Sequence, residues 1–435
     1  QRAALGNWSL ALLAGLAHAA ARALPGSGAP QWWLQLAALL ALAWLGRPGT
    51  PWRRAAGRGW VFATAWLAGT FWWLFISMHI YGGLASPLAG AAVLALAAFL
   101  ALYYAVSLGL FSALAHTPRA LSALIFAALW LLAELARGTW WTGFPWGASG
   151  YAHVDGPLAA LARSVGVYGI AAVAAALAML LAQLRRSDLY RPRAWALVVT
   201  VAIALAGLSW QRQQAIATPN PAATAPLTLA LLQGSIPQDE KFQFGSGIPM
   251  ALQWYSDQLR NATQQLVVAP ETAIAVLPQQ LPPDYLQTIE DQYTSGAQAA
   301  LIGIPLGDLR LGYTNSVLGW QPGQSAPYRY NKQHLVPFGE FIPPFFRWFT
   351  DLMNIPLGDF SRGALVQPPF VWQGERLAPN ICSEDLFGEE LGARFADPDN
   401  PPTVFVNLRN IARLGHSTAH DKHLQTRPNR PLHFE

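Results

Sequence analysis

Cysteine and charged residues are scarce in this sequence. The 435 residues include one cysteine, and only 12% are charged, against 53% that are hydrophobic. A single cysteine excludes a disulfide within the chain, and so small a charged fraction is unlike that of an average soluble protein. The length exceeds that of one ordinary domain. The composition therefore predicts a protein of more than one domain, with part of it in a membrane.

The few charges are also unevenly distributed. Residues 1–210 contain no lysine and three acidic residues but thirteen arginines, a net charge of about +10. Because the whole chain carries +5, residues 211–435 carry about −5. This asymmetry indicates a basic membrane part joined to a mildly acidic soluble part. Most of the arginines lie in short loops between apolar runs, so the basic balance does not indicate nucleic-acid binding.

Seven apolar segments of residues 1–210 predict a polytopic α-helical membrane domain, since a helical crossing needs roughly 20 apolar residues. Arginines gather in the loops after the second, fourth and sixth segments, which the positive-inside rule places in the cytoplasm. Residues 211–435 are then outside the cytoplasm, and we expect them in the periplasm of a bacterium. The segments are about 8–24, 32–46, 60–80, 88–115, 121–140, 164–184 and 194–210.

Aromatic residues are concentrated in the predicted outer loop that follows the fifth segment. Residues 137–146 include three tryptophans and a phenylalanine. Tryptophan favours the headgroup layer, so an interfacial belt is one interpretation. The other is a lipid-access surface, with Arg137 binding a phosphate. Glu134 lies one helical turn from Arg137 and could pair with it.

The polar half predicts an α/β layered domain, residues 227–435, after a proline-rich linker at 211–226. Apolar runs at 227–234, 266–269, 299–304 and 403–407 are typical of buried strands, and residues 248–265 and 283–295 are typical of helices. Strands that alternate with helices indicate layered α/β packing. In such domains the chemistry tends to lie at strand ends.

Three polar residues suit acyl transfer through a thioester. Glu271 follows a predicted strand, and Lys332 and Cys382 lie further along the chain. A thiol needs a base to take its proton, and a carboxylate can serve. A nearby ammonium lowers the thiol pKa and stabilises an oxyanion. The alternative is that the lone cysteine is a small buried apolar residue.

The sequence around these residues resembles the nitrilase superfamily, and over residues 5–410 the chain resembles its membrane branch, the apolipoprotein N-acyltransferase family. The longest similar stretch surrounds Lys332. The stretches that carry the resemblance are Thr142 to Trp146, Asp155 to Pro157, Gln233 to Gln238, Pro270 to Ala273, Asn331 to Pro343 and Phe360 to Gly363.

The resemblance implies an αββα sandwich with a Glu-Lys-Cys triad. Glu271 would be the general base, Lys332 the oxyanion stabiliser and Cys382 the nucleophile, with Glu340 and Glu384 in support. The implied reaction is ping-pong. Cys382 takes an acyl chain from the sn-1 ester of a phospholipid, for which phosphatidylethanolamine is the expected donor. The α-amine of a diacylglyceryl-cysteine lipoprotein then accepts that chain in the bacterial inner membrane. We expect no cofactor, no metal and a monomer.

Aromatic residues near the predicted triad are candidates for substrate binding. Residues 338–362 form an apolar loop, which we predict to be a lid that dips into the bilayer over the acyl chain. The alternative is ordinary packing. Together with Arg137, the substrate-binding candidates are Phe242, Phe341, Phe345 and Phe346.

The chain departs from the family pattern in places. Ser383 follows the cysteine where the family usually has tyrosine, and residues 409–435 match only loosely, so we expect the catalytic domain to be C-terminally incomplete relative to the family. Two alternatives to acyl transfer are considered. One is a membrane-tethered amidase or nitrile hydrolase, in which water resolves the thioester. The other is a catalytically inactive lipid-binding membrane protein, which the altered tail favours.

Overall fold

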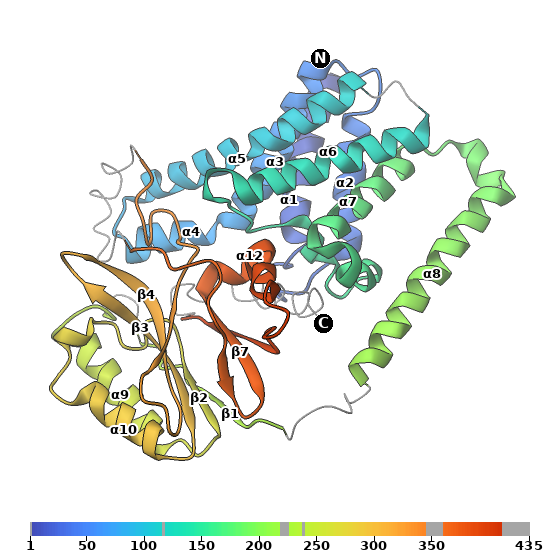
Figure 1. Ribbon diagram of the computed structural model, residues 1–435. Coiled ribbons are helices and arrows are strands. Elements are labelled where there is room, and N and C mark those ends of the chain that lie inside the picture. Colours follow the sequence, from blue (N-terminus) through green and yellow to red (C-terminus); the bar gives the residue numbers. More distant parts are fainter. Residues whose placement is uncertain (1, 115–117, 218–225, 237–239, 345–359, 411–435) are drawn as a thin grey trace. The chain divides into compact units, whose positions relative to one another are not determined.

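The computed structural model describes residues 2–114, 118–217, 226–236, 240–344 and 360–410 (Figure 1). The chain divides into two units. The first comprises Gln1–Ile76 and Ala85–Pro219, and the second comprises Ser77–Leu84 and Asn220–Gly415. Long helices make up the described part of the first unit, and two β-sheets with short helices make up most of the second.

Each of the seven predicted apolar segments is helical. Their helices are α1 (Arg2–Ala20), α2 (Trp32–Leu45), α3 (Trp52–Phe71), α5 (Ser86–Leu114), α6 (Arg119–Thr139), α7 (Ala162–Ala182) and α8 (Pro192–Ala217). Between α3 and α5 lie the four-residue α4 (Trp73–Ile76) and a π-helical turn, Ser77–Tyr81. The last helix extends past residue 210 into the predicted linker, because no proline or glycine interrupts it before Pro219.

Three stretches of the described chain are long and apolar enough to cross a membrane. These are Ser86–Leu114, Arg119–Thr142 and Pro157–Ala182. A fourth is Trp52–Phe71 with Trp73–Ile80 if that pair, bent by 49°, is one span. Trp32–Leu45 is apolar but shorter. The chain is therefore a membrane protein, while the expected number of seven crossings stays a prediction.

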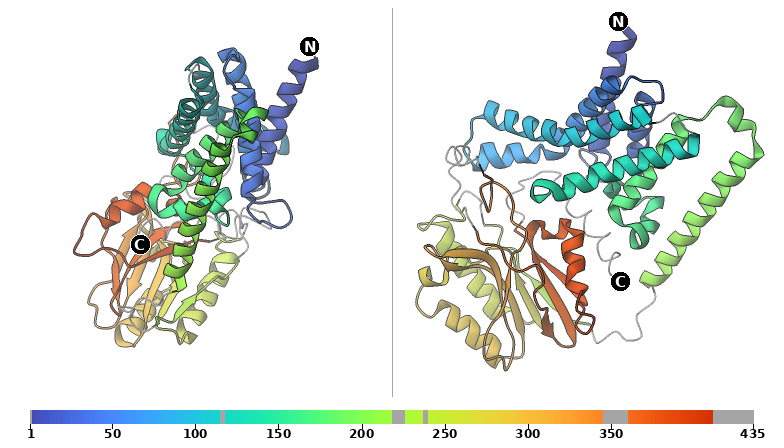
Figure 2. Two further views of the ribbon diagram at one scale, coloured as in Figure 1. Left: turned by 90° about the vertical axis from the view of Figure 1, so that its right-hand side faces the viewer. Right: turned by 45° about the horizontal axis from the view of Figure 1, so that its top comes forward.

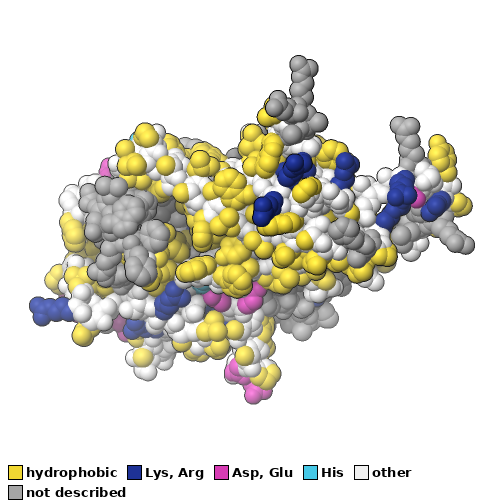
Figure 3. Space-filling model, turned by 90° about the horizontal axis from the view of Figure 1, so that it is seen from above, with side chains coloured by type: hydrophobic (Ala, Val, Ile, Leu, Met, Phe, Trp, Pro, Cys, Tyr) yellow, Lys and Arg dark blue, Asp and Glu magenta, His cyan; other side chains and the backbone are white. Residues whose placement is uncertain are grey.

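Large apolar side chains remain exposed along these helices, as a bilayer requires. On α5 they include Leu94, Phe99, Leu102, Val106 and Leu110. Hydrophobic side chains cover much of the face drawn in Figure 3. In water such a surface would promote association, but against lipid tails it has no such cost.

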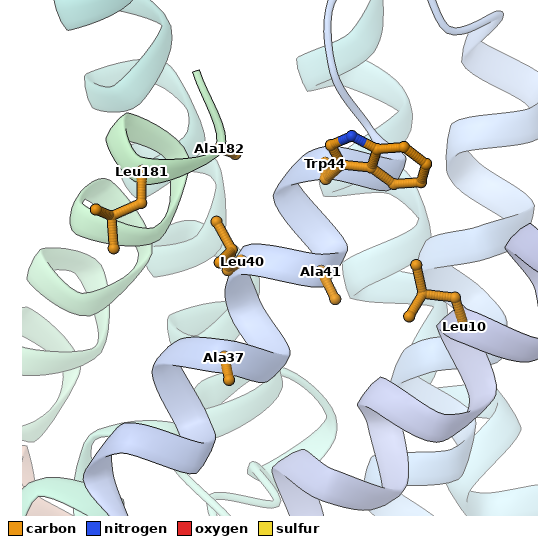
Figure 4. Close-up of a pocket in the computed structure, with 7 residues that line it drawn as sticks. All are labelled: Leu10, Ala37, Leu40, Ala41, Trp44, Leu181 and Ala182. Atoms are coloured by element: carbon orange, nitrogen blue, oxygen red, sulfur yellow. The ribbon is translucent and has the colours of Figure 1, made fainter. Parts of the chain in front are cut away.

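An apolar cavity of about 360 Å³ lies among α1, α2 and α7 (Figure 4). It contains none of the predicted catalytic residues. Its lining residues are Leu10, Ala37, Leu40, Ala41, Trp44, Leu181 and Ala182. Its walls are aliphatic and aromatic, so it is suited to hydrocarbon and offers no group for chemistry.

The second unit contains a five-stranded and a three-stranded sheet. The first has the order β1 (Leu229–Leu231), β2 (Leu266–Ala269), β3 (Ala299–Asp308), β4 (Gly312–Trp320) and β5 (Tyr328–Asn331). Its strands β1, β2 and β3 are parallel, and β4 is antiparallel to both β3 and β5. The second sheet has the order β6 (Phe370–Trp372), β7 (Glu375–Ile381) and β8 (Val404–Leu408).

Alternating side chains of β2 bury both faces of the larger sheet. Val267 and Ala269 pack with helices α9 (Gly247–Asn261) and α10 (Tyr285–Ser295), which lie along one face (Figures 1 and 2). Leu266 and Val268 pack on the other face against β6, β7 and β8. A strand that is buried on both faces has apolar residues at consecutive positions of the sequence rather than at alternate ones. Short helices follow β7, including α12 (Gly388–Gly392). The predicted fold class, a polytopic helical part with an α/β sandwich, is thus confirmed.

Four strands have no counterpart among the apolar runs that the sequence displays. β4, β5 and β7 contain polar residues and, in β7, Pro379, while β6 is only three residues long. Their pairing partners are distant or antiparallel neighbours, so local propensity does not reveal them. These strands carry much of the site described next.

Candidate active site

Polar side chains from three strands of the larger sheet lie together at one end of the strands. Glu271 lies two residues beyond β2, and Lys332 directly follows β5. Asn315 is on β4, which runs antiparallel, so its early residues lie at the edge where β5 ends. The Lys332 backbone N–H donates to the Asn315 carbonyl at 2.8 Å. Carboxyl ends of strands are where α/β domains commonly place ligands.

Lys332, Glu340, Glu271 and Asn315 form a cluster at this end of the strands, and Lys332 lies between the two carboxylates. Its Nζ is 2.8 Å from Glu340 and 3.6 Å from Glu271 Oε1. The Asn315 amide donates to both, at 2.8 Å to Glu271 Oε1 and 2.8 Å to Glu340 Oε1. The exposed fractions of the side chains are 0% for Lys332, 7% for Glu340 and 14% for Glu271. Glu271 is thus the member of this cluster that is most open to solvent.

Cys382 lies at the end of β7 in the smaller sheet, and its side chain is half-buried. The strand stops there because Cys382 has φ +56°, a left-handed conformation that non-glycine residues rarely adopt. Asn407 of β8 donates to the Cys382 carbonyl at 3.0 Å and also to the Asn380 side chain. This turn projects the cysteine at the end of the strand rather than within the sheet.

Glu384 ties the lysine segment to the cysteine turn. Its carboxylate accepts from the backbone N–H of Gln333 at 2.7 Å and of Ile381 at 2.7 Å. It also accepts from the His334 N–H at 3.2 Å and from the Tyr330 hydroxyl at 2.8 Å. The residues after β5 and those before Cys382 therefore share one buried carboxylate, which fixes the spacing of the two strand ends.

Backbone strain is concentrated around the same residues. Thr272, next to Glu271, has φ +48°, and Phe338, in the segment after Lys332, has φ +63°. With Cys382, three of the left-handed non-glycine residues of the second unit adjoin the cluster. Such residues cost on the order of 1–3 kcal/mol each and tend to occur at functional sites. The positions of these side chains are therefore over-determined by the surrounding fold.

The charges of the cluster shift the pKa values of Lys332 and Cys382. Burial lowers the pKa of Lys332, but Glu340 and Glu271 more than reverse this, so the lysine stays protonated. Burial raises the pKa of the Cys382 thiol to about 11, and Glu271 adds to that rise, while Lys332 and Arg409 oppose it. The thiol is therefore largely protonated at neutral pH and needs a base before it can attack.

Replacing Asn315 by leucine should destabilise the protein and impair the cluster. Both carboxylates lose a hydrogen bond at a buried position, which costs about 1–3 kcal/mol. Thermal unfolding in detergent would measure the loss. The isosteric variant Asn315→Asp places a third carboxylate beside Glu271 and Glu340, so we expect it to lower the unfolding temperature further. Equal stability of the wild type and both variants would contradict a bridging role for Asn315.

The substrate-binding candidates are dispersed. Phe341 is half-buried, and the guanidinium of Arg362 lies 5.3 Å from the centre of its ring. Phe242 is half-buried, and Lys241 Nζ is 5.6 Å from its ring. Phe345 and Phe346, with most of the expected lid, lie outside the described residues. No observation tests a substrate contact for any of them, so these roles stay predictions.

Arg137 lies in the first unit, where its side chain contacts other groups of the protein. Its side chain is fully buried, and its guanidinium donates to the Tyr104 hydroxyl at 2.9 Å. It also donates to the carbonyls of Phe144 and Trp146 at 2.6 and 2.7 Å, and Glu134 is 3.9 Å away. These contacts hold the aromatic loop, while phosphate binding by Arg137 stays a prediction.

Three residues of the cluster escaped the sequence interpretation. Asn315 lies on a strand that was not predicted, and the polar run of Thr314, Asn315 and Ser316 shows no apolar alternation that could have indicated it. Lys241 is buried and donates to Thr272 Oγ1 and, at 3.4 Å, to the Glu271 carbonyl. The positive charge of Arg409 lowers the pKa of the Cys382 thiol. Only the scarcity of lysine in the sequence could have drawn attention to Lys241.

The fold and the cluster define a helical membrane protein that carries an α/β sandwich with a cysteine at a strand end. Residues 11–180 match the sequence model of the apolipoprotein N-acyltransferase N-terminal domain. The chain is 62% identical to an apolipoprotein N-acyltransferase of Verminephrobacter eiseniae, over 98% of this chain and 82% of that protein. It is 44% identical to one of Ralstonia nicotianae, over 92% and 76%. The chain belongs to the apolipoprotein N-acyltransferase family.

Among solved structures, an amidase of the nitrilase superfamily from Nesterenkonia is similar at a TM-score of 0.30 and 16% identity, over 42% of this chain and 64% of that one. A carbon-nitrogen hydrolase from Helicobacter pylori is similar at a TM-score of 0.31 and 12% identity, over 48% and 68%.

Proposed function

We propose that this protein transfers an acyl chain from a phospholipid to the N-terminal α-amine of diacylglyceryl-cysteine lipoproteins through a thioester on Cys382. The observation that carries the proposal is the buried lysine held between two carboxylates, whose charges act on the thiol of the only cysteine. Membership of the apolipoprotein N-acyltransferase family supports the choice of reaction.

In the first half-reaction Glu271 takes the proton of the Cys382 thiol as the sulfur attacks the sn-1 ester carbonyl of the donor. The Lys332 ammonium stabilises the oxyanion of the tetrahedral intermediate. When the intermediate collapses, the carbon–oxygen bond to glycerol breaks, and the proton on Glu271 passes to the departing alkoxide. The products are a lysophospholipid and an acyl thioester, with Glu271 again ionised and able to act as a base.

In the second half-reaction the neutral α-amine of the lipoprotein attacks the thioester carbonyl. Glu271 accepts a proton from the attacking nitrogen, and Lys332 again faces the oxyanion. The carbon–sulfur bond breaks, and the proton returns to Cys382, which restores the resting enzyme. The two substrates never meet, because one leaves before the other reacts, which is ping-pong covalent catalysis.

Glu340 and Glu384 have supporting roles in this scheme. Glu340 bonds to Lys332 and also accepts from the Val336 N–H at 2.9 Å, so it fixes the ammonium relative to the backbone. Glu384 keeps the lysine and cysteine segments at a fixed separation through its four hydrogen bonds. Neither needs to exchange a proton with substrate.

The membrane context is part of the proposal. The arginine-rich loops predict that residues 1–210 cross a bacterial inner membrane and that residues 227–435 lie in the periplasm. Both substrates are lipid-anchored, so tethering the catalytic domain to the bilayer keeps it close to both of them. We propose phosphatidylethanolamine as the donor and a monomer as the working form.

The direct test is mass spectrometry of the purified protein after incubation with phosphatidylethanolamine. We expect an acyl-sized mass increase on the peptide that contains Cys382, and its loss when a diacylglyceryl lipopeptide is added, with the mass appearing on the lipopeptide. No adduct on folded protein would overturn the proposal. An adduct released only as free fatty acid would show a hydrolase instead.

Replacing Glu271 by glutamine should make the thiol more acidic and yet slow acyl transfer. Removing the carboxylate removes a negative charge that raises the pKa of Cys382 above its ordinary value. The pH midpoint of iodoacetamide alkylation should fall below about 11. Transfer should decrease by about 10²–10⁴-fold, because the general base is lost.

The matched control is Asp257→Asn, which removes an exposed carboxylate from α9. It should change neither the alkylation midpoint nor the rate of transfer. A Glu271→Gln variant whose alkylation midpoint is unchanged, or which transfers at the wild-type rate, would contradict the role of Glu271 as the base.

A further inference from the structure

Arg409 occupies the strand end beside the nucleophile. Strands β7 and β8 are parallel with Ile381 opposite Leu408, and the residues that directly follow these strand ends are Cys382 and Arg409, respectively. Neighbouring strands lie about 4.8 Å apart. The side chain of Asn407, two residues before Arg409, holds the Cys382 carbonyl at 3.0 Å. The backbone that carries Arg409 is therefore fixed to the cysteine turn.

The two buried lysines of the cluster both contact groups of the fold. Glu271 and Glu340 carry two negative charges against the one positive charge of Lys332, and Lys332 is fully buried between them. Lys241 is also buried, and it donates to the Thr272 hydroxyl and to the Glu271 carbonyl. Arg409 is half-buried, and its positive charge lowers the pKa of the Cys382 thiol. Its charge therefore acts at the sulfur, and its side chain is less buried than that of Lys332.

We propose that Arg409 binds the phosphodiester of the acyl donor and thereby places the donor's ester against the Cys382 sulfur. This inference rests on the proposed function and names the part of the donor that the site recognises. Phosphate and ester of a glycerophospholipid are joined through the glycerol unit, so they can occupy two adjacent strand ends. A guanidinium suits the phosphate because it donates two parallel N–H bonds to two oxygens.

The test compares two acyl donors on the full chain in detergent. One is phosphatidylethanolamine and the other is p-nitrophenyl palmitate, an ester without a phosphate. The rate of Cys382 acylation is measured against donor concentration for the wild type, Arg409→Gln and Arg409→Lys. The control, Arg329→Gln, removes an exposed arginine from β5 and leaves the cysteine turn intact.

We expect Arg409→Gln to raise the half-saturating concentration of phosphatidylethanolamine on the order of tenfold or more, the effect of losing a charge-assisted hydrogen bond. Arg409→Lys should recover part of it, because an ammonium keeps the charge but not the paired bonds. The half-saturating concentration of p-nitrophenyl palmitate should change by no more than about twofold, far less than the loss of a charge-assisted hydrogen bond would cause. The control should match the wild type with both donors.

Two results would overturn the inference. An equal loss with both esters, accompanied by a higher pH midpoint for iodoacetamide alkylation of Cys382, would show that Arg409 acts on the thiol alone. Unchanged kinetics with phosphatidylethanolamine would show that it does not bind the donor. Failure of the proposed function is distinguishable, because then phosphatidylethanolamine would not acylate wild-type Cys382 at any concentration.

Discussion

Replacing Cys382 by alanine should abolish acyl transfer and leave the fold intact. In the proposed reaction the sulfur forms a covalent bond to the acyl chain, and the sequence contains no other thiol. Loss of a covalent nucleophile typically lowers turnover by at least about 10³-fold. The side chain is half-buried at a strand end, so its removal creates little cavity, and unfolding should occur near the wild-type temperature.

Ser383 provides a matched control for this variant. It is the next residue, it is almost fully buried, and its hydroxyl has no hydrogen-bond partner among the described residues. Ser383→Ala should therefore retain activity and stability. Because Cys382 is the only cysteine, thiol labelling of Ser383→Ala reports an intact site, and Cys382→Ala should not label. Measurable transfer by folded Cys382→Ala would refute the nucleophile assignment.

The sequence predicts Glu271 well because local signals surround it. The run from Leu266 to Ala269 is apolar throughout, which indicates a strand buried on both faces, and the proline after it ends the strand. The structure has β2 at those residues. The prediction needed no knowledge of distant contacts, because strand formation and strand end are both visible within a few residues.

Lys332 and Cys382 required the resemblance to a known family. Their strands, β5 and β7, have no clear apolar alternation, and β7 contains charged residues and a proline. What makes β7 a strand is its pairing with β6 and β8 and its burial against the larger sheet. Such tertiary stabilisation overrides local preference and leaves little trace in one sequence.

The positions of supporting residues depend on register, which sequence patterns do not give. Asn315 reaches Glu271 and Glu340 because β4 pairs with β3 and β5 in one particular alignment. A shift by one residue would turn its side chain to the opposite face. The possible pairing of Glu134 with Arg137 is observed only at 3.9 Å, since the guanidinium donates instead to the Tyr104 hydroxyl and to the carbonyls of Phe144 and Trp146.

Replacing Lys332 by methionine should remove both activity and much of the stability. Methionine fills a similar volume without a charge, so Glu340 and Glu271 would face each other with no cation between them. Breaking a buried ion pair by removing one partner costs about 3–5 kcal/mol. The Lys332 side chain is completely buried, so solvent cannot screen that loss. Unfolding in detergent would measure it as a lower transition temperature.

A second substitution separates the structural from the catalytic part of this effect. In Lys332→Met with Glu340→Leu, the carboxylate bonded most closely to the lysine is removed as well, so a buried apolar pair replaces a buried ion pair. Such replacements are often neutral for stability, but the Asn315 amide and the Val336 N–H lose Glu340 as an acceptor, so we expect part of the lost stability to return. Activity should not return, because the oxyanion still lacks its cation. If the double variant recovered acyl transfer along with stability, Lys332 would act only by holding the fold, and the oxyanion role would have to pass to another group.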